Sequence, residues 1–557
     1  MSREQNLAVA QSVTLRPIEE IAARLSLPPQ YLEPYGRFKA KVALEALSAA
    51  PPRPGGKLVL VSAINPTPAG EGKTTTTVGL GQALARLGKS AAVAIREPSM
   101  GPVFGVKGGG CGGGRSQVLP MEDINLHFTG DIHAVGAAHN LLSAMLDNAL
   151  FHGLVDLDVR QIRWRRVMDM NDRALRQIVI GLGGRLMGVP REEGFDITAA
   201  SEVMAILCLA DGPADLVERL SHIVLGFSHK GEAVTARQVQ APEAMAIILK
   251  DALKPNLVQT VEGVPAFVHG GPFGNIAHGC NSVLATRLAL RYADFVVTEA
   301  GFGFDLGGEK FLDIKCREAG VWPSAVVLVA TVKALKMHGG TALGEINRPD
   351  LKTLKLGMGN LAKHAESVRE FGLRPIVAVN RFATDTDDEL KLVVEESRAL
   401  GLEATVIDVF GHGGEGGLPL AEAVVAACQG SAPAPRFLYP LDLSIEDKIR
   451  TIAQKIYGAA DVALLPRART DVERIKALGY DNVPICMAKT QLSLSDDPKL
   501  FGRPRGFTLT VREVRLSAGA GFCVPLTGEM LTMPGLPAKP AAVNMHMDAN
   551  GKISGMF

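Results

Sequence analysis

Short apolar runs alternate with longer amphipathic stretches over most of the chain, a pattern that predicts strands and helices in turn. Residues 57–64 form the first clear run, which is β-branched and of strand length. After a loop rich in proline and glycine, residues 74–87 have helical length and residues 90–95 form a second apolar run. A strand, a helix and a strand in this order predict a βαβ unit, and therefore a parallel sheet with a right-handed crossover.

Four later apolar runs continue the pattern, at residues 293–298, 325–330, 375–380 and 404–409. A segment of helical length, residues 387–400, lies between the last two. Thr386 and Glu389 have the spacing of a capping box at its start, which supports a helix there. Residues 1–55 look helical, and the alternation weakens after residue 440.

The composition adds what kind of protein to expect. Hydrophobic residues make up 47% of the 557 positions and charged residues 21%, which excludes a disordered chain. The formal net charge of +1 argues against nucleic acid or an anionic membrane as a partner. No apolar run approaches the ~18 residues of a membrane span, and charges interrupt the N-terminal region where a signal peptide is apolar. We therefore expect a cytoplasmic protein, with its seven widely spaced cysteines reduced.

A candidate phosphate-binding loop lies between the first strand and its helix. Its residues are Thr67, Pro68, Ala69, Gly70, Glu71, Gly72, Lys73, Thr74 and Thr75. Glycines let backbone N–H groups curl around a phosphate, the lysine reaches the β- and γ-phosphates, and the Thr74 hydroxyl is placed to ligate Mg²⁺. The strict motif begins with glycine where this chain has Thr67, so a generic glycine turn is the alternative.

Arg96 ends the second strand of this unit and is expected to face the same crevice as Lys73. Its planar guanidinium suits a carboxylate or phosphate, although an ordinary salt bridge would also explain it. Six glycines follow within residues 108–114. A flexible linker is one interpretation of this tract, but a loop that brings backbone close to a ligand fits its position better.

The segment after the glycine tract carries His127, Asp131 and His133. Their spacing matches no usual zinc pattern, so a zinc site is not expected. Asp131 is either the N-cap of a following helix or a group that acts on a proton or orients a substrate.

These elements predict an α/β protein in three parts. Residues 1–365 form a P-loop-type parallel-sheet domain for nucleotide, residues 366–465 a second α/β domain, and residues 466–557 a smaller α+β domain.

The longest motifs resemble one family, the formate–tetrahydrofolate ligases. The resemblance is carried by residues 67–77, 96–109, 124–133, 168–173, 195–198, 200–205, 269–282, 298–305, 413–417, 526–528 and 533–537. It implies that ATP, formate and tetrahydrofolate give ADP, phosphate and 10-formyltetrahydrofolate through formyl phosphate. Formate is a poor acylating agent because hydroxide leaves badly, whereas phosphate leaves readily.

The resemblance also assigns residues. Lys73 and Arg96 would stabilise the transferring phosphoryl group, and the acids Glu97 and Asp131 would line the same centre, with Asp131 helping to remove the proton of the attacking folate nitrogen. Phe382 matches a phenylalanine that stacks on the pterin ring. The second stacking position, usually tryptophan, is Phe410 here, which offers a smaller face. Simple core burial is the alternative for both rings.

The family further implies a homotetramer, ATP bound with Mg²⁺, and activation by a monovalent cation, K⁺ or NH₄⁺, as an open question for this chain. Two other functions remain as alternatives. One is a P-loop ATPase switch whose ATP state recruits a protein partner, and the other is an ATP-dependent ligase for a different small acid.

Overall fold

A single twelve-stranded sheet organises the computed structural model, which describes residues 3–49, 55–68, 70–106, 110–430 and 433–556. Along its main path the strand order is β1-β2-β13-β14-β4-β15-β3-β16-β17-β18. From β14 to β18 each strand runs parallel to its neighbour. These strands are β14 (Pro265–Val268), β4 (Ala91–Ile95), β15 (Phe295–Glu299), β3 (Lys57–Ala63), β16 (Ala325–Ala330), β17 (Pro375–Asn380) and β18 (Glu403–Ile407).

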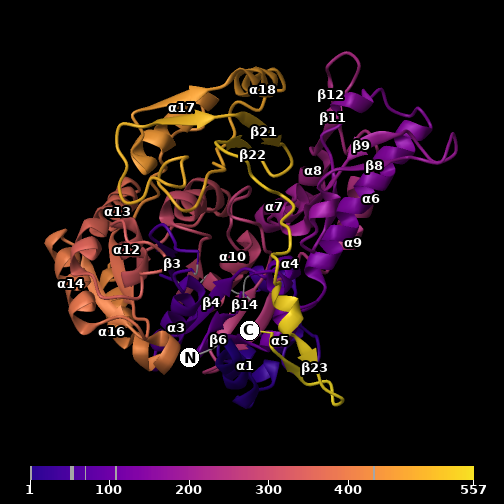
Figure 1. Cartoon of the computed structure of the whole chain (residues 1–557). Coiled ribbons are helices and arrows are strands. Elements are labelled where there is room, and N and C mark those ends of the chain that lie inside the picture. The colour runs from indigo at the N-terminus through magenta and orange to yellow at the C-terminus, as the bar shows by residue number, and fades with distance from the viewer. Residues whose placement is uncertain (1–2, 50–54, 69, 107–109, 431–432, 557) are drawn as a thin grey trace.

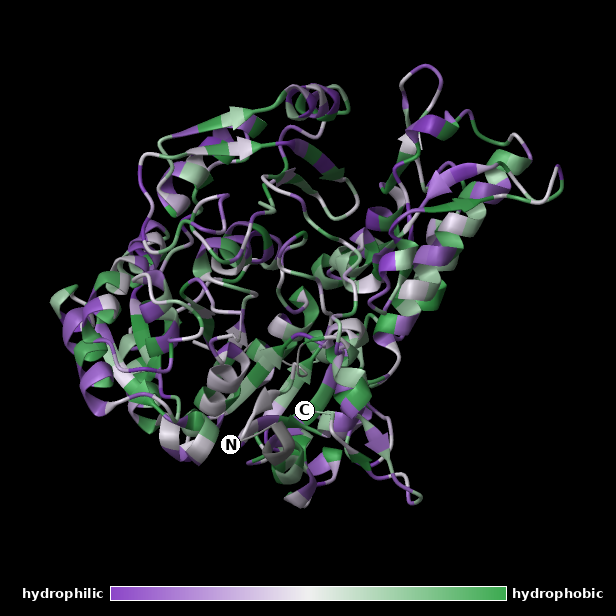
Figure 2. Ribbon diagram, in the orientation of Figure 1, coloured by the Kyte–Doolittle hydropathy of each residue, from purple (hydrophilic) through white to green (hydrophobic). Residues whose placement is uncertain are grey.

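Helices cover both faces of the parallel strands, and Figure 2 shows these strands as largely hydrophobic. In β3, Val59 and Val61 pack with α3 (Lys73–Arg86) and α16 (Leu418–Ala427). The alternate side chains, Leu58 and Leu60, belong to the core on the other face. Helices α10 (Val283–Tyr292), α12 (Val332–His338) and α13 (Leu351–Glu370) contribute to that second core. Burial on both faces explains why these strands read as continuous apolar runs rather than as alternating ones.

The predicted βαβ unit and the later strands are confirmed. Strand β15 lies between β3 and β4, so these two strands are parallel without being neighbours. Helix α14 (Asp387–Ala399) begins with the expected capping box, in which Thr386 and Glu389 each bond the other's backbone N–H. All seven cysteines are buried and unpaired.

The N-terminal region differs from the helical prediction. It holds α1 (Arg3–Ser12) and α2 (Ile18–Ala23), but also β1 (Leu32–Pro34) and β2 (Ala40–Val42). Strand β2 pairs antiparallel with β13 (Asn256–Thr260), which lies more than 200 residues further along the chain. Such a short strand is stabilised by a distant partner, so the local sequence carries little sign of it.

Two predicted boundaries have no matching break in the sheets. Residue 366 lies inside α13, and β17 and β18 continue the sheet of β16 instead of forming a second one. Across residue 466, β19 (Asp461–Leu464) pairs with β20 (Thr508–Val511). We call these two strands, together with α17 (Ile445–Ile452), α18 (Pro466–Ala477), β21 (Glu513–Ser517) and β22 (Phe522–Leu526), the C-terminal part.

Two features extend from the sheet (Figure 1). An arm that includes α6 (Asp131–Phe151) and α9 (Pro242–Leu249) also carries the hairpins β8–β9 and β11–β12, formed by residues 178–193 and 224–235. The chain after β22 leaves the C-terminal part and returns to the sheet, where the Ala541 N–H bonds the Gly105 carbonyl at 2.7 Å. Among the described residues no helix is both long and apolar enough to cross a bilayer.

Candidate functional site

The carboxyl ends of the parallel strands bring the candidate residues to one edge of the sheet. Strand β3 leads into the phosphate loop, β4 into Arg96 and Glu97, and β15 ends at Glu299. Further along this edge, Phe382 follows β17 and Phe410 follows β18. Ligands of open α/β sheets bind at this edge, so residues more than 300 positions apart in sequence converge on one candidate site.

The phosphate loop has the backbone conformation that its glycines permit. Gly70 and Gly72 have φ values of 84° and 73°, in the region that favours glycine. Thr67, at the position of the missing first glycine, is not among the residues with positive φ and so needs no glycine there. Pro68 precedes Ala69, which lies outside the described residues, and Gly72 caps α3. The departure from the strict motif therefore causes no positive-φ strain at Thr67.

Glu71 holds the loop from inside. Its carboxylate accepts the Thr67 N–H at 2.6 Å and also the hydroxyl of Thr331, which follows β16. The Asn380 side chain donates to the Glu71 carbonyl at 3.0 Å. Burial raises the pKa of the Glu71 carboxyl. The glutamate of this loop is thus a structural brace, held by residues that follow or end β16 and β17, two successive strands on one side of β3.

Glu299 joins the phosphate loop to Arg96. The Thr74 hydroxyl donates to Glu299 Oε2 at 2.8 Å, and Arg96 Nη2 lies 3.8 Å from Glu299 Oε1. Lys73 and Thr75 stand on either side of Thr74 in the first turn of α3. Arg96 therefore faces the loop, as expected, while its Nε has no hydrogen-bond partner among the described residues. The long contact with Glu299 leaves the guanidinium able to bind an anion.

Glu97 and Asp131 form a buried acidic pair next to this centre. Asp131 accepts hydrogen bonds from Lys41 Nζ and from the Asn256 side chain, both at 2.7 Å, and neither Lys41 nor Asn256 is exposed. Burial, and then the charge of Asp131, hold the pKa of Glu97 well above its usual range. Glu97 is therefore the member of the pair that burial keeps protonated, while Asp131 forms a buried ion pair with Lys41.

Asp131 is not the N-cap of the following helix, which was one of its two interpretations. The N-cap of α6 is Gly130, with φ of 89°, and Asp131 is the first residue of the helix without a side-chain capping bond. His127 and His133 are exposed while Asp131 is buried, so the three do not converge. No group of three or more histidine, cysteine or acidic side chains suited to a metal occurs among the described residues.

The two candidate stacking rings are partly exposed and lie outside the hydrophobic core. Lys333 Nζ lies 4.8 Å from the centre of the Phe382 ring. Phe410 packs against the glycine tract: a Cβ at Gly113 would lie 2.9 Å from its ring, and one at Gly114 2.0 Å from its carbonyl oxygen. Residues 108 and 109 lie outside the described part. At the described end of the tract, Gly113 and Gly114 let the backbone approach an aromatic ring, which a flexible linker would not require.

Three residues of the site were missed by sequence reasoning. Glu299 lies in the motif of residues 298–305, and its position directly after the predicted strand 293–298 could have identified it as a site residue. Lys41 and Asn256 had no such signal, because β2 and β13 meet Asp131 only through pairing of distant segments.

One comparison identifies the family. The family model for formate–tetrahydrofolate ligase matches residues 4–557. The chain belongs to this family. The match covers the described site from the phosphate loop to the strand-end aromatic residues. It supports formate–tetrahydrofolate ligase activity, with ATP and tetrahydrofolate as substrates, and gives no support to a nucleotide switch.

The raised pKa of Glu97 predicts a pH-dependent stability. The folded ligase keeps this proton above pH 4.5, the ordinary value at which the unfolded chain releases it. Folding stability is therefore lost as the pH rises from that value towards the folded pKa. We expect the free energy of unfolding of Glu97→Gln, relative to wild type, to increase with pH in urea titrations. Glu529→Gln, whose side chain is 86% exposed, is the control, and a pH-independent difference would contradict the prediction.

Proposed function

We propose that the site phosphorylates formate with ATP and that the formyl group of the resulting formyl phosphate passes to tetrahydrofolate. The contact of Thr74 and Arg96 with one carboxylate, Glu299, carries this proposal, because it places an anion-binding guanidinium beside a phosphate loop. Phosphoryl transfer needs mainly positioning and charge stabilisation from a protein. The formate oxygen attacks the γ-phosphorus and ADP leaves. The folate nitrogen then attacks the formyl carbon, and phosphate leaves with the electron pair of the broken C–O bond and takes up the proton that the nitrogen loses.

Each charged residue has a distinct role in this proposal. Lys73 and Arg96 stabilise the oxygens of the transferring phosphoryl group. The neutral carboxyl of Glu97 donates a hydrogen bond to an oxygen of formate or phosphate. Asp131 is already bonded to Lys41 and Asn256, so we assign it to holding this cation and keeping Glu97 protonated, rather than to removing the folate proton.

The phosphate loop is the first part to test. ADP formation should require both formate and tetrahydrofolate, and Lys73→Ala should lower kcat by about 10²- to 10³-fold, as for loss of one charge-stabilising donor. Lys89→Ala changes an exposed lysine after the same helix and serves as the control. ADP release that continues without formate or without folate would refute the proposal. Replacing formate by acetate tests the remaining alternative, a ligase for another small acid.

A magnesium ion bound with ATP fits the oxygen atoms at the loop. Mg²⁺ favours one or two carboxylate or hydroxyl ligands together with substrate phosphates and water. Thr74 Oγ1 and Glu299 Oε2, 2.8 Å apart beside the phosphate loop, would be such ligands. When bound, the ion would neutralise charge on the β- and γ-phosphates. Glu299 would fix the Thr74 hydroxyl and offer its carboxylate to the ion.

Glu299→Gln should raise the metal concentration needed for half-saturation about 10- to 100-fold, while keeping an acceptor for Thr74. Binding of Mn²⁺ to the ligase with a non-hydrolysable ATP analogue, followed by electron paramagnetic resonance, measures this without turnover. Glu262→Gln, which changes an acid paired with Arg86, is the control. Equal Mn²⁺ affinity in wild type and Glu299→Gln would remove Glu299 from the metal site.

Phe382 and Phe410 are proposed to hold the folate ring. Phe382→Ala should raise the KM for tetrahydrofolate by the equivalent of about 0.5–1.5 kcal/mol beyond the lost contact area, and Phe410→Trp should lower it by enlarging the stacking face. Phe151→Ala is the control. It changes an aromatic residue on the arm that is 41% exposed, and it should leave the KM for tetrahydrofolate unchanged. If Phe382→Ala lowers only the stability and leaves the folate KM unchanged, core packing is its role instead.

A further inference from the structure

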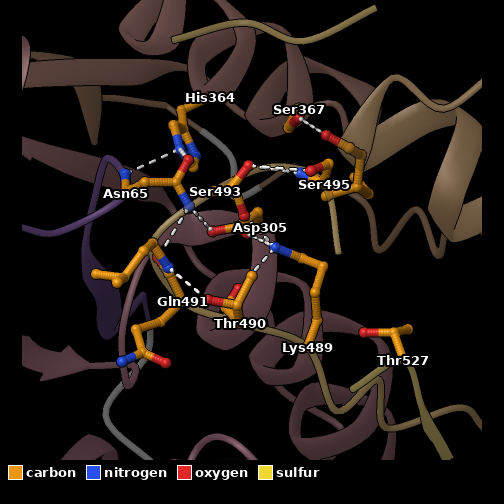
Figure 3. A network of polar contacts seen from close by, with 12 residues as sticks. Asn65, Asp305, His364, Ser367, Lys489, Thr490, Gln491, Ser493, Ser495 and Thr527 are labelled. Carbon is orange, nitrogen blue, oxygen red and sulfur yellow. Dashed lines mark hydrogen bonds and ion pairs between the residues drawn. The ribbon is translucent and has the colours of Figure 1, made fainter. Parts of the chain in front are cut away.

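Asn65 connects the end of β3 to the phosphate loop, two residues before Thr67. It is fully buried, and each of its backbone and side-chain polar groups has a hydrogen-bond partner. Its side-chain amide donates to Asp305 Oδ1 and to the Gln491 carbonyl, both at 3.2 Å. Its side-chain oxygen accepts from the Asn360 amide at 3.0 Å. Figure 3 shows this asparagine at the centre of segments from different parts of the chain.

Two histidines complete the environment of Asn65. His338 Nε2 donates to the Asn65 carbonyl at 2.9 Å, since its Nδ1 accepts the Gly502 N–H. His364 Nε2 lies 3.0 Å from Asn65 Oδ1, and its Nδ1 has no partner among the described residues. The Asn65 backbone N–H also donates to His364 Nε2 at 3.1 Å, so this ring nitrogen contacts both the backbone and the side chain of Asn65. Burial lowers the pKa of His364 to about 4, which keeps the ring neutral.

The network ends in an ion pair from the C-terminal part. Lys489 Nζ lies 3.0 Å from Asp305 Oδ2, and both side chains are fully buried. Lys489 also donates to the carbonyls of Thr490 and Ser493, so three acceptors surround its ammonium group. Asp305 lies in the π-helical turn Phe304–Gly308, which follows β15, the strand that ends at Glu299. The lysine thus links the C-terminal part to both strand-end loops of the site (Figure 3).

A buried polar network of this kind is stable only when each group keeps its partner. Any shift of Asn65 would leave donors or acceptors unsatisfied on several elements at once, so the network permits one position of the residue. The phosphate loop starts at that position, and Glu71 fixes its other end. Misplacing a reacting group by about 1 Å costs about 10²-fold in rate, so the anchor has a direct bearing on catalysis.

From these contacts we infer that Asn65 is a positioning residue for the phosphate loop, and that the Asp305–Lys489 pair holds it in register from the C-terminal part. The inference rests on the proposed role of the loop in binding ATP. It adds a function for the C-terminal part, which otherwise contributes no candidate site residue. It predicts damage at the nucleotide without damage at the folate ring, because Phe382 and Phe410 follow other strands, β17 and β18.

The test compares full-length variants by steady-state kinetics, by equilibrium binding of ATP with Mg²⁺, and by urea unfolding. Asn65→Ala should lower kcat/KM for ATP about 10- to 100-fold and weaken ATP binding, while the KM for tetrahydrofolate stays unchanged. Lys448→Met is the matched control. It removes a fully buried lysine of the same part, one that donates to the Asp481 and Val483 carbonyls and not to the Asn65 network. The control should lose stability and keep every KM.

A second variant guards against loss of folding. Asp305→Leu combined with Lys489→Met replaces the ion pair by apolar side chains of similar size, a change that often preserves stability. It should reproduce the ATP defect of Asn65→Ala. Kinetic constants equal to those of Lys448→Met in both variants, or equal rises in KM for ATP and folate, would overturn the inference. If Lys73→Ala also binds and uses ATP normally, the proposed function of the loop fails instead.

Discussion

Burial of the parallel sheet on both faces is the constraint on which the rest of this ligase depends. Strands such as β16 turn every side chain towards a packed helix layer, which leaves little room for chemistry within the sheet. Polar side chains therefore gather where the strands end, and all parallel strands end at the same edge. The candidate phosphate loop, Arg96, Glu299 and the two aromatic residues lie along the same edge because of this direction of the chain, although long stretches of sequence separate them.

The electrostatics of the site are local. A net charge of +1 is spread over 557 residues, yet three anionic substrates have to be held. The structure meets this with few cations at defined positions: Lys41 compensates Asp131 inside the protein, and the guanidinium of Arg96 keeps hydrogen-bonding capacity for a ligand. A protonated Glu97 adds a donor without adding charge. Binding of anions by such a centre needs no basic surface.

How far the sequence predicts a structural feature depends on how far apart along the chain the residues that determine it lie. The phosphate loop, the strands around it and the capping box of Thr386 were predictable because each is encoded within a few residues. The glycine tract pointed to a close approach, and Gly113 and Gly114 make one with Phe410. The pairing of β2 with β13, and with it the position of Lys41, was not predictable because its partner lies far along the chain. The predicted boundary at residue 366 also rests on local sequence. The alternation of strand and helix patterns starts again near this residue, whereas the sheet continues from β16 into β17 and β18.

The return of residues 541–556 to the sheet has a consequence for the stability of the candidate phosphate loop. Met556 packs in the same hydrophobic cluster as Leu7 of α1 and Val78 of α3, the helix that follows this loop. Residues more than 450 positions apart thus share one small core. Proteolytic removal of the last segment would open this core to water and loosen the packing of α3, although no residue of the loop itself would be lost.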